Sequence, residues 1–195
     1  EFRRVLFRSV LDLNHPQGRE AMLRLTRQSD VLIYNVRPQA MARLGLSWED
    51  VRAVNPRLLY VGTYGYSQNG PYAAKAAYDD LIQGASGVPW AVSRTGAEPN
   101  YAPVNFADRV TGLHAVYTVT TALFQRERTG VGQSIEVPMF ESISHFVLGD
   151  HLAGLSWMEP VGGAGYQRLI ARRPYRTSDG YLCVLVYNDK QWRSF

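Results

Sequence analysis

Asp108 stands directly before the strongest helical pattern of the chain, which covers residues 109–128. Aspartate is favoured at a helix N-cap, where its carboxylate accepts hydrogen bonds from the first backbone N–H groups. The same N–H groups and the helix dipole keep such a carboxylate ionised. An ionised carboxylate can also attack an activated acyl group and form a covalent intermediate. The local sequence therefore leaves two roles open for Asp108, a helix cap and a nucleophile.

Two further polar groups could contact a ligand. Asn35-Val36-Arg37-Pro38 follows at the end of an apolar run, and ligands of open α/β sheets bind beyond the carboxyl ends of the strands. Asn35 and Arg37 could therefore contact an anion, although a turn closed by Asn35 and Pro38 is the structural alternative. Tyr78 and Asp79 precede a short helical pattern, where capping is again the alternative for the aspartate.

Several common catalytic motifs do not occur in the sequence. It contains no G-x-x-x-x-G-K-[ST] phosphate loop, no G-x-G-x-x-G after a strand and no G-x-S-x-G nucleophile elbow. The four histidines show no metal-ligand spacing with cysteine or carboxylates, so we expect no metal site. ATP hydrolysis and metal-dependent chemistry are therefore not indicated.

The hydrophobic periodicity predicts an α/β fold. Helices are expected at 16–28, 109–128 and 139–152, with shorter ones at 48–56 and 77–85. Ser47 and Asp50 have the spacing of a capping box for the helix at 48–56. Buried strands are expected at 31–36, 58–63 and 134–137, and 87–106 is expected to be irregular. The alternation indicates an open, mainly parallel sheet with flanking helices.

The chain is expected to contain one partial domain and the start of another. Residues 10–153 would form a partial large domain, 154–172 a linker, and 173–195, with a hairpin around Asp179-Gly180, the start of a smaller α+β domain. Residues 1–9 resemble a translated sequencing adapter, and we interpret them as non-native.

Composition narrows the class of protein. Hydrophobic residues make up 46% and charged residues 19%, which is typical of a globular protein. The net charge of +4 is spread over short stretches, and no apolar run is long enough to span a membrane. A single cysteine, Cys183, excludes an internal disulfide. We therefore expect a cytoplasmic protein without nucleic-acid or membrane partners.

Six segments, in order and at fitting intervals, carry a resemblance to a known family. They are LDLNHPQGRE, DVLIYNVRPQAMARLGL, NPRLLYVGTYGYSQNGPY, AYDDLIQGASG, ADRVTGLHA and QRERTGVGQSIEVPM. Together they resemble the class III CoA-transferases of the CaiB/BaiF type, which include formyl-CoA transferase, carnitine CoA-transferase and the α-methylacyl-CoA racemases. The last part, residues 173–192, resembles the opening of the smaller domain of that family.

The resemblance implies a Rossmann-like large domain and a role for each matching residue. Asp108 matches the catalytic aspartate, while Tyr78 and Asp79 match the pair that flanks the acyl group. The residues that match CoA-lining segments are Leu11, Asp12, Leu13, Asn14, Asn35, Val36, Arg37 and Arg43. Asn14 occupies a position that is commonly lysine in the family, so one positive contact to CoA is missing.

The implied activity is transfer of CoA from an acyl-CoA donor to a carboxylic acid acceptor, through an aspartyl anhydride and an aspartyl-CoA thioester. CoA would be a substrate, no cofactor would be tightly bound, and the full-length protein would be a longer, interlocked homodimer. Gly162 to Gly165 could supply oxyanion-stabilising N–H groups, or be a flexible connector.

Two alternatives stay open. One is a racemase on the same scaffold, which Tyr78 disfavours because the racemases have a histidine there and free tyrosine has a pKa near 10. The other is a non-catalytic CoA-binding or scaffold protein.

Overall fold

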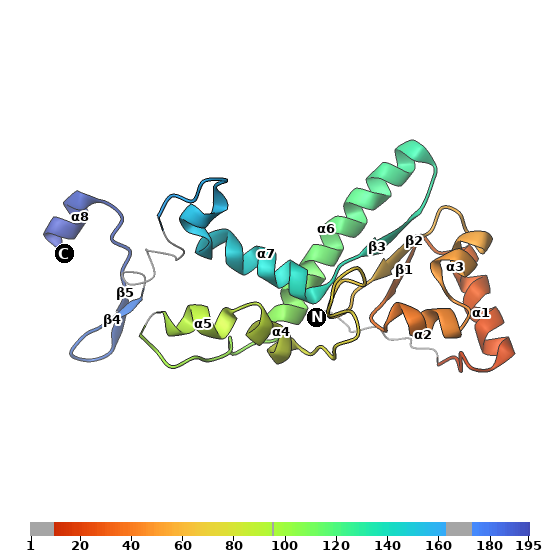
Figure 1. Cartoon of the computed structure of the whole chain (residues 1–195), viewed down its shortest axis with the longest axis horizontal. Helices are drawn as coiled ribbons and strands as arrows, with labels where there is room; N and C mark the ends of the chain where they lie inside the picture. The colour runs from red at the N-terminus through yellow and green to blue at the C-terminus, as the bar shows by residue number, and fades with distance from the viewer. Residues whose placement is uncertain (1–9, 95, 163–172) are drawn as a thin grey trace. The chain divides into compact units, whose positions relative to one another are not determined.

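The structure, a computed structural model, describes residues 10–94, 96–162 and 173–195. The chain folds into two compact units (Figure 1). The first consists of Glu1–Tyr78 and Ala107–Ser142, and the second of Asp79–Phe106 and Ile143–Phe195.

The first unit is built on a three-stranded parallel sheet. The strands β1 (Val31–Tyr34), β2 (Leu59–Gly62) and β3 (Gln133–Glu136) lie in the order β1-β2-β3. Val31 pairs with Leu59 and Leu59 with Gln133, so all three strands end at the same edge of the sheet. This arrangement confirms the predicted α/β class with parallel strands.

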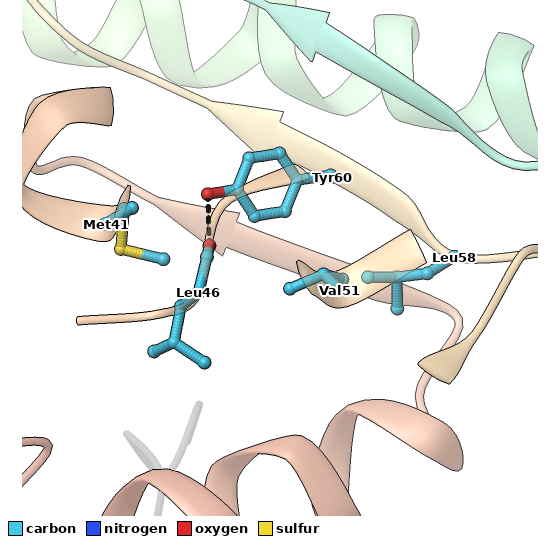
Figure 2. Close-up of a cluster of buried hydrophobic side chains, with 5 residues drawn as sticks. All are labelled: Met41, Leu46, Val51, Leu58 and Tyr60. Atoms are coloured by element: carbon cyan, nitrogen blue, oxygen red, sulfur yellow. Dashed lines mark hydrogen bonds between the residues drawn. The ribbon is translucent and has the colours of Figure 1, made fainter. Parts of the chain in front are cut away.

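Three helices cover one face of the sheet: α1 (Pro16–Arg27), α2 (Pro38–Arg43) and α3 (Trp48–Val54). Their core consists of five buried side chains, Met41, Leu46, Val51, Leu58 and Tyr60 (Figure 2). The predicted capping box is confirmed: the Ser47 hydroxyl accepts the Asp50 N–H, and the Asp50 carboxylate accepts the Ser47 N–H. The Tyr60 hydroxyl donates to the Leu46 carbonyl at 2.7 Å, which joins β2 to the α2–α3 turn.

The long helix α6 (Phe106–Thr129) covers the opposite face, where its fully buried apolar residues are small and the expected residues Val119 and Leu123 pack beside them partly buried. Ala115 and Ala122 pack on Leu59, Val61 and Val137. The large apolar residues Leu113, Val116 and Phe124, expected in the apolar pattern of this helix, are instead mostly exposed. Small residues allow the helix backbone to lie close to the sheet, and the large residues form a stripe on its outer side.

The second unit is mainly helical. It contains α4 (Asp79–Ala85), α5 (Val88–Ser93), most of α7 (Met139–His151) and the short 3₁₀ turn η1 (Ala153–Ser156). The predicted hairpin is formed by the antiparallel strands β4 (Pro174–Arg176) and β5 (Tyr181–Cys183), and α8 (Asp189–Ser194) follows it. In the described part of the chain, no helix is both long and apolar enough to cross a membrane.

Three short helices were not expected from the sequence, and one helix begins earlier than predicted. α2 lies where a turn was considered, α5 lies in the stretch predicted to be irregular, and α8 occupies the last residues. Pro38 at the first position of α2 and Gly45 after its end are a recognisable helix signature, because proline suits N1 and glycine suits C′. α6 begins at Phe106, so Asp108 lies inside its first turn and is not the residue before the helix.

Because Ala115 packs against the sheet, we predict that Ala115→Leu destabilises the folded protein by about 1–3 kcal/mol through overpacking. Val116→Leu, at the next and mostly exposed position, is the matched control and should change stability by less than about 0.5 kcal/mol. Urea unfolding of both variants in the full-length protein measures the difference. Equal effects at the two positions would contradict the assigned face of α6.

Candidate functional site

The end of α2 is fixed by a Schellman turn. The Gly45 N–H donates to the Ala42 carbonyl at 2.9 Å, and the Leu46 N–H donates to the Met41 carbonyl at 2.9 Å. Gly45 has φ +66°, a conformation that side chains other than glycine rarely adopt. Leu46 and Met41 then pack together in the core. This turn holds Arg43, the last residue of α2, at a defined place on the surface.

Arg43 lies between two small pockets of the first unit. The first, of 230 Å³, is lined by α2 and the loop after β2; its lining residues are Arg37, Gln39, Ala40, Arg43, Ala73 and Ala74. The second, of 220 Å³, is lined by the start of α1 and the end of α2; its lining residues are Leu13, Asn14, His15, Pro16, Arg19, Arg43 and Leu44.

Three arginines and no carboxylate line these two pockets. Within the described residues, none of the ion pairs involves Arg19, Arg37 or Arg43. Guanidinium groups bind phosphates through paired, charge-assisted hydrogen bonds. The two adjoining pockets, called here the arginine pockets, can therefore bind a ligand with several phosphate groups.

Gly45 also makes room for one of these arginines. A Cβ atom at Gly45 would lie only 2.4–2.6 Å from atoms of the Arg19 guanidinium. The glycine that closes α2 thus allows Arg19, on α1, to lie close to the turn that follows Arg43.

The loop of residues 65–77 forms the outer wall of the first arginine pocket through Ala73 and Ala74. Its two ends are in contact, because a Cβ at Gly65 would lie 2.0 Å from the Cβ of Ala77. The Arg37 guanidinium donates to the Ala74 carbonyl at 3.5 Å. Lys75 Nζ lies 3.8 Å from the centre of the Tyr72 ring, which places a further cation on this loop.

Ser67 and Gln68 connect this loop to the rest of the first unit. The Ser67 N–H donates to Glu141 at 3.1 Å, and its hydroxyl donates to Glu136, at the end of β3, at 3.0 Å. Gln68 accepts a hydrogen bond from the Gln39 side chain of α2 at 2.9 Å. The pocket wall is therefore linked both to the edge of the sheet and to the helix that carries Arg43.

Three tyrosines in or directly after strands β1 and β2 remain protonated at neutral pH. Burial is the main cause that raises the pKa of Tyr34, Tyr60 and Tyr64 above the ordinary value. A hydrogen bond to Glu136 raises the pKa of Tyr64 further. These hydroxyls are therefore hydrogen-bond donors at neutral pH and cannot act as bases there.

Asp108 lies in the first turn of α6 with an exposed side chain. The first turn of a helix has N–H groups without partners inside the helix, and these favour an ionised carboxylate. Asp108 does not line either arginine pocket. Its role as nucleophile stays a prediction.

The two residues predicted to flank the acyl group, Tyr78 and Asp79, differ in exposure. Tyr78 is 75% exposed. Asp79 is half-buried at the start of α4, and its carboxylate accepts a hydrogen bond from Gln83. Gln83, which is 0% exposed, in turn accepts the Ala102 N–H at 2.9 Å.

The structure brings together only part of the predicted CoA-binding set. Leu13, Asn14, Arg37 and Arg43 line the arginine pockets. Asp12 shapes the turn before α1, since its carboxylate accepts the Asn14 N–H at 3.0 Å. Leu11, Asn35 and Val36 are, like Asp12, exposed and do not line these pockets.

Sequence reasoning missed Arg19 and Lys75. Arg19 lies in the first turn of α1, where acidic residues are usual and none occurs, and that departure was the available signal. Lys75 had no local signal, because its place beside the pocket wall depends on the fold of the 65–77 loop.

Two other expectations concern absent or undescribed features. Among the described residues, no group of three or more metal-ligating side chains is found. Gly163 to Gly165, part of the glycine cluster considered for oxyanion stabilisation, lie outside the described residues.

Comparison with known proteins decides the family. The model of CoA-transferase family III matches residues 7–195. The chain belongs to CoA-transferase family III.

Similar proteins and a solved structure agree with this assignment. The chain is 34% identical to a succinate–glutarate CoA-transferase of Agrobacterium fabrum, over 94% of this chain and 46% of the relative. It is 36% identical to an acetyl-CoA:oxalate CoA-transferase of Acetobacter aceti, over 85% of this chain and 42% of the relative. A CaiB/BaiF family protein from Brucella suis shares the fold with a TM-score of 0.78 and 32% identity, over 94% of this chain and 49% of that one. The family III chain described here thus spans about half the length of the curated relatives it matches.

Because Arg43 lines both arginine pockets, we predict that Arg43→Ala raises the dissociation constant of CoA at least about tenfold, through loss of charge-assisted contacts. The difference should shrink at high salt. Arg52→Ala, which removes an exposed arginine of α3, is the control and should have little effect. Calorimetric titration with CoA at two salt concentrations measures these affinities. Equal affinities for Arg43→Ala and the unmodified protein would contradict this assignment.

The hydrogen bonds of Ser67 lead to a second prediction. Ser67→Ala removes the hydroxyl bond to Glu136 and should raise the KM for acyl-CoA several-fold while kcat stays within about twofold, because the variant loosens the pocket wall without touching the reacting atoms. Ser29→Ala removes a comparable hydroxyl bond, to the Leu25 carbonyl at the end of α1, and is the control. A fall in kcat alone would show that Ser67 does not act through the pocket.

Proposed function

We propose that the full-length protein transfers CoA from an acyl-CoA donor to a carboxylic acid acceptor, with Asp108 as the covalent nucleophile. The observation that supports binding of CoA most directly is the pair of adjoining pockets in which Arg19, Arg37 and Arg43 meet no carboxylate. CoA carries a diphosphate and a further phosphate, which match such a site. Membership of CoA-transferase family III supports the reaction class.

The proposed reaction uses four displacements at carbonyl carbons. An Asp108 carboxylate oxygen attacks the donor thioester, the carbon–sulfur bond breaks, and CoA thiolate leaves behind a mixed anhydride. The thiolate then attacks the Asp108 carbonyl, which releases the donor acid and leaves an aspartyl-CoA thioester.

The acceptor follows the same path in reverse. Its carboxylate attacks the Asp108 carbonyl and displaces the CoA thiolate, forming a second anhydride. The thiolate attacks the acceptor carbonyl, giving the new acyl-CoA and the free Asp108 carboxylate. One thioester is formed for each one broken, so the reaction needs no nucleotide hydrolysis.

The start of α6 suits this role. A carboxylate in the first helical turn is held ionised by free N–H groups, and exposure leaves Asp108 accessible to a substrate. Tyr78 carries a phenol and not an imidazole, so it offers no histidine base for removal of an α-proton, which favours attack at the carbonyl.

We also propose a cytoplasmic homodimer for the full-length protein. Leu113, Val116, Tyr117 and Phe124 form an exposed apolar stripe along α6, and such a stripe is normally covered. A second copy of the protein, together with other parts of the full-length chain, would cover this stripe.

Chemical trapping tests the nucleophile. Incubation of the full-length protein with acyl-CoA and then hydroxylamine should convert the Asp108 side chain into a hydroxamate, which peptide mass spectrometry can locate. Asp108→Ala should abolish this label and lower kcat on the order of 10⁴-fold. Glu127→Gln, at the opposite end of the same helix, should keep both the label and the activity.

Three results would point elsewhere. Activity retained in Asp108→Ala would exclude the covalent role. Exchange of the substrate α-proton with deuterated water, without any acceptor acid, would indicate the racemase. Binding of CoA without turnover of any donor would indicate a binding protein.

A further inference from the structure

The second unit contains an open apolar pocket of 380 Å³. Val88, Ala91 and Val92 line it from α5, and Phe146 and Val147 line it from α7. Ala102 and Phe106 complete the apolar lining, so seven of the nine lining residues are apolar. A pocket of this volume and lining suits the apolar part of a small molecule.

One end of the pocket is polar and acidic. Asp150 and His151, at the end of α7, are its remaining lining residues. The His151 ring contacts the Trp90 ring edge-on at 5.8 Å, and the Phe106 ring contacts that of Phe146 edge-on at 5.7 Å. The charged group of this pocket is a carboxylate, in contrast to the arginine pockets, so a second carboxylate would be repelled there.

Hydrogen bonds within the second unit connect this pocket to a predicted acyl-site residue. Asp79 accepts from the side chain of Gln83, and Gln83, which is fully buried, accepts the Ala102 N–H. Asp79 is thus tied through one buried side chain to the pocket wall.

The start of α6 gives a separate connection. Phe106, a lining residue, begins the helix, and Asp108 lies in the same first turn. Within the second unit, the buried connection from Asp79 therefore ends at the lining of this apolar pocket.

We infer that this pocket binds the aliphatic chain of the acyl group, so that the enzyme prefers uncharged aliphatic acyl-CoA donors over donors that end in a second carboxylate. The inference rests on the proposed function. Each methylene that enters an apolar pocket contributes roughly fourfold in affinity. A donor whose acyl chain ends in a carboxylate would not gain this affinity, and its carboxylate would also approach Asp150.

Comparing three donors in the full-length protein tests the inference: acetyl-CoA, hexanoyl-CoA and succinyl-CoA. We expect kcat/KM for hexanoyl-CoA to exceed that for acetyl-CoA and succinyl-CoA by about tenfold or more.

Ala91→Phe, which fills the pocket, should lower kcat/KM for hexanoyl-CoA about tenfold and leave kcat/KM for acetyl-CoA within about twofold. Val147→Ala enlarges the pocket and should shift the preference towards octanoyl-CoA. Ala53→Phe, at an exposed position of α3, is the matched control and should leave all ratios unchanged.

Calorimetric titration with acetyl-CoA and hexanoyl-CoA separates this inference from the proposed function. If CoA is transferred but neither Ala91→Phe nor Val147→Ala alters chain-length preference, the pocket assignment is wrong and the transfer function stands. If no donor is turned over, yet hexanoyl-CoA binds more tightly than acetyl-CoA and Ala91→Phe removes the difference, the pocket assignment stands and the transfer function fails. A preference for succinyl-CoA over hexanoyl-CoA would overturn the inference directly.

Discussion

The left-handed turn at Gly45 is the constraint on which the arrangement of the arginine pockets depends. It ends α2 so that Leu46 enters the core, where the Tyr60 hydroxyl binds its carbonyl, and Arg43 stays at the surface. The same glycine leaves space for the guanidinium of Arg19. One backbone conformation therefore joins the packing of the sheet to the position of two cations, and a residue with a side chain at this position would disturb both.

The two units carry pockets of opposite character. The first unit has pockets lined by arginines and by no carboxylate, and Ser67 and Gln68 connect the loop that forms one wall to β3, α7 and α2. The second unit offers an apolar pocket with an acidic end. The chemistry of the acyl-CoA thioester would fall to Asp108, in the first turn of α6.

The sequence allowed the sheet and the long helices to be predicted because those elements are coded locally. Apolar runs in the sequence predicted β1 and β2, and hydrophobic periodicity predicted α1, α6 and α7. Local coding failed for α2 and α5, whose six residues are too few to show a period, although Pro38 and Gly45 marked the ends of α2. Periodicity also could not show that α6 packs through Ala115 and Ala122, because small residues add little to a hydrophobic pattern.

For the site, Arg37 was indicated by its place after an apolar run and by family resemblance, and Arg43 by family resemblance alone, whereas the places of Arg19 and Lys75 beside the pockets depend on the fold. Arg19 acts with Arg43 because α1 and the end of α2 meet in space, and no local pattern contains that information. The most direct test of the whole account is a crystal structure of the full-length protein with CoA bound. We expect phosphate groups on Arg19, Arg37 and Arg43, with the CoA sulfur within reach of the Asp108 carboxylate. Phosphates bound away from these arginines, or a sulfur atom remote from Asp108, would contradict it.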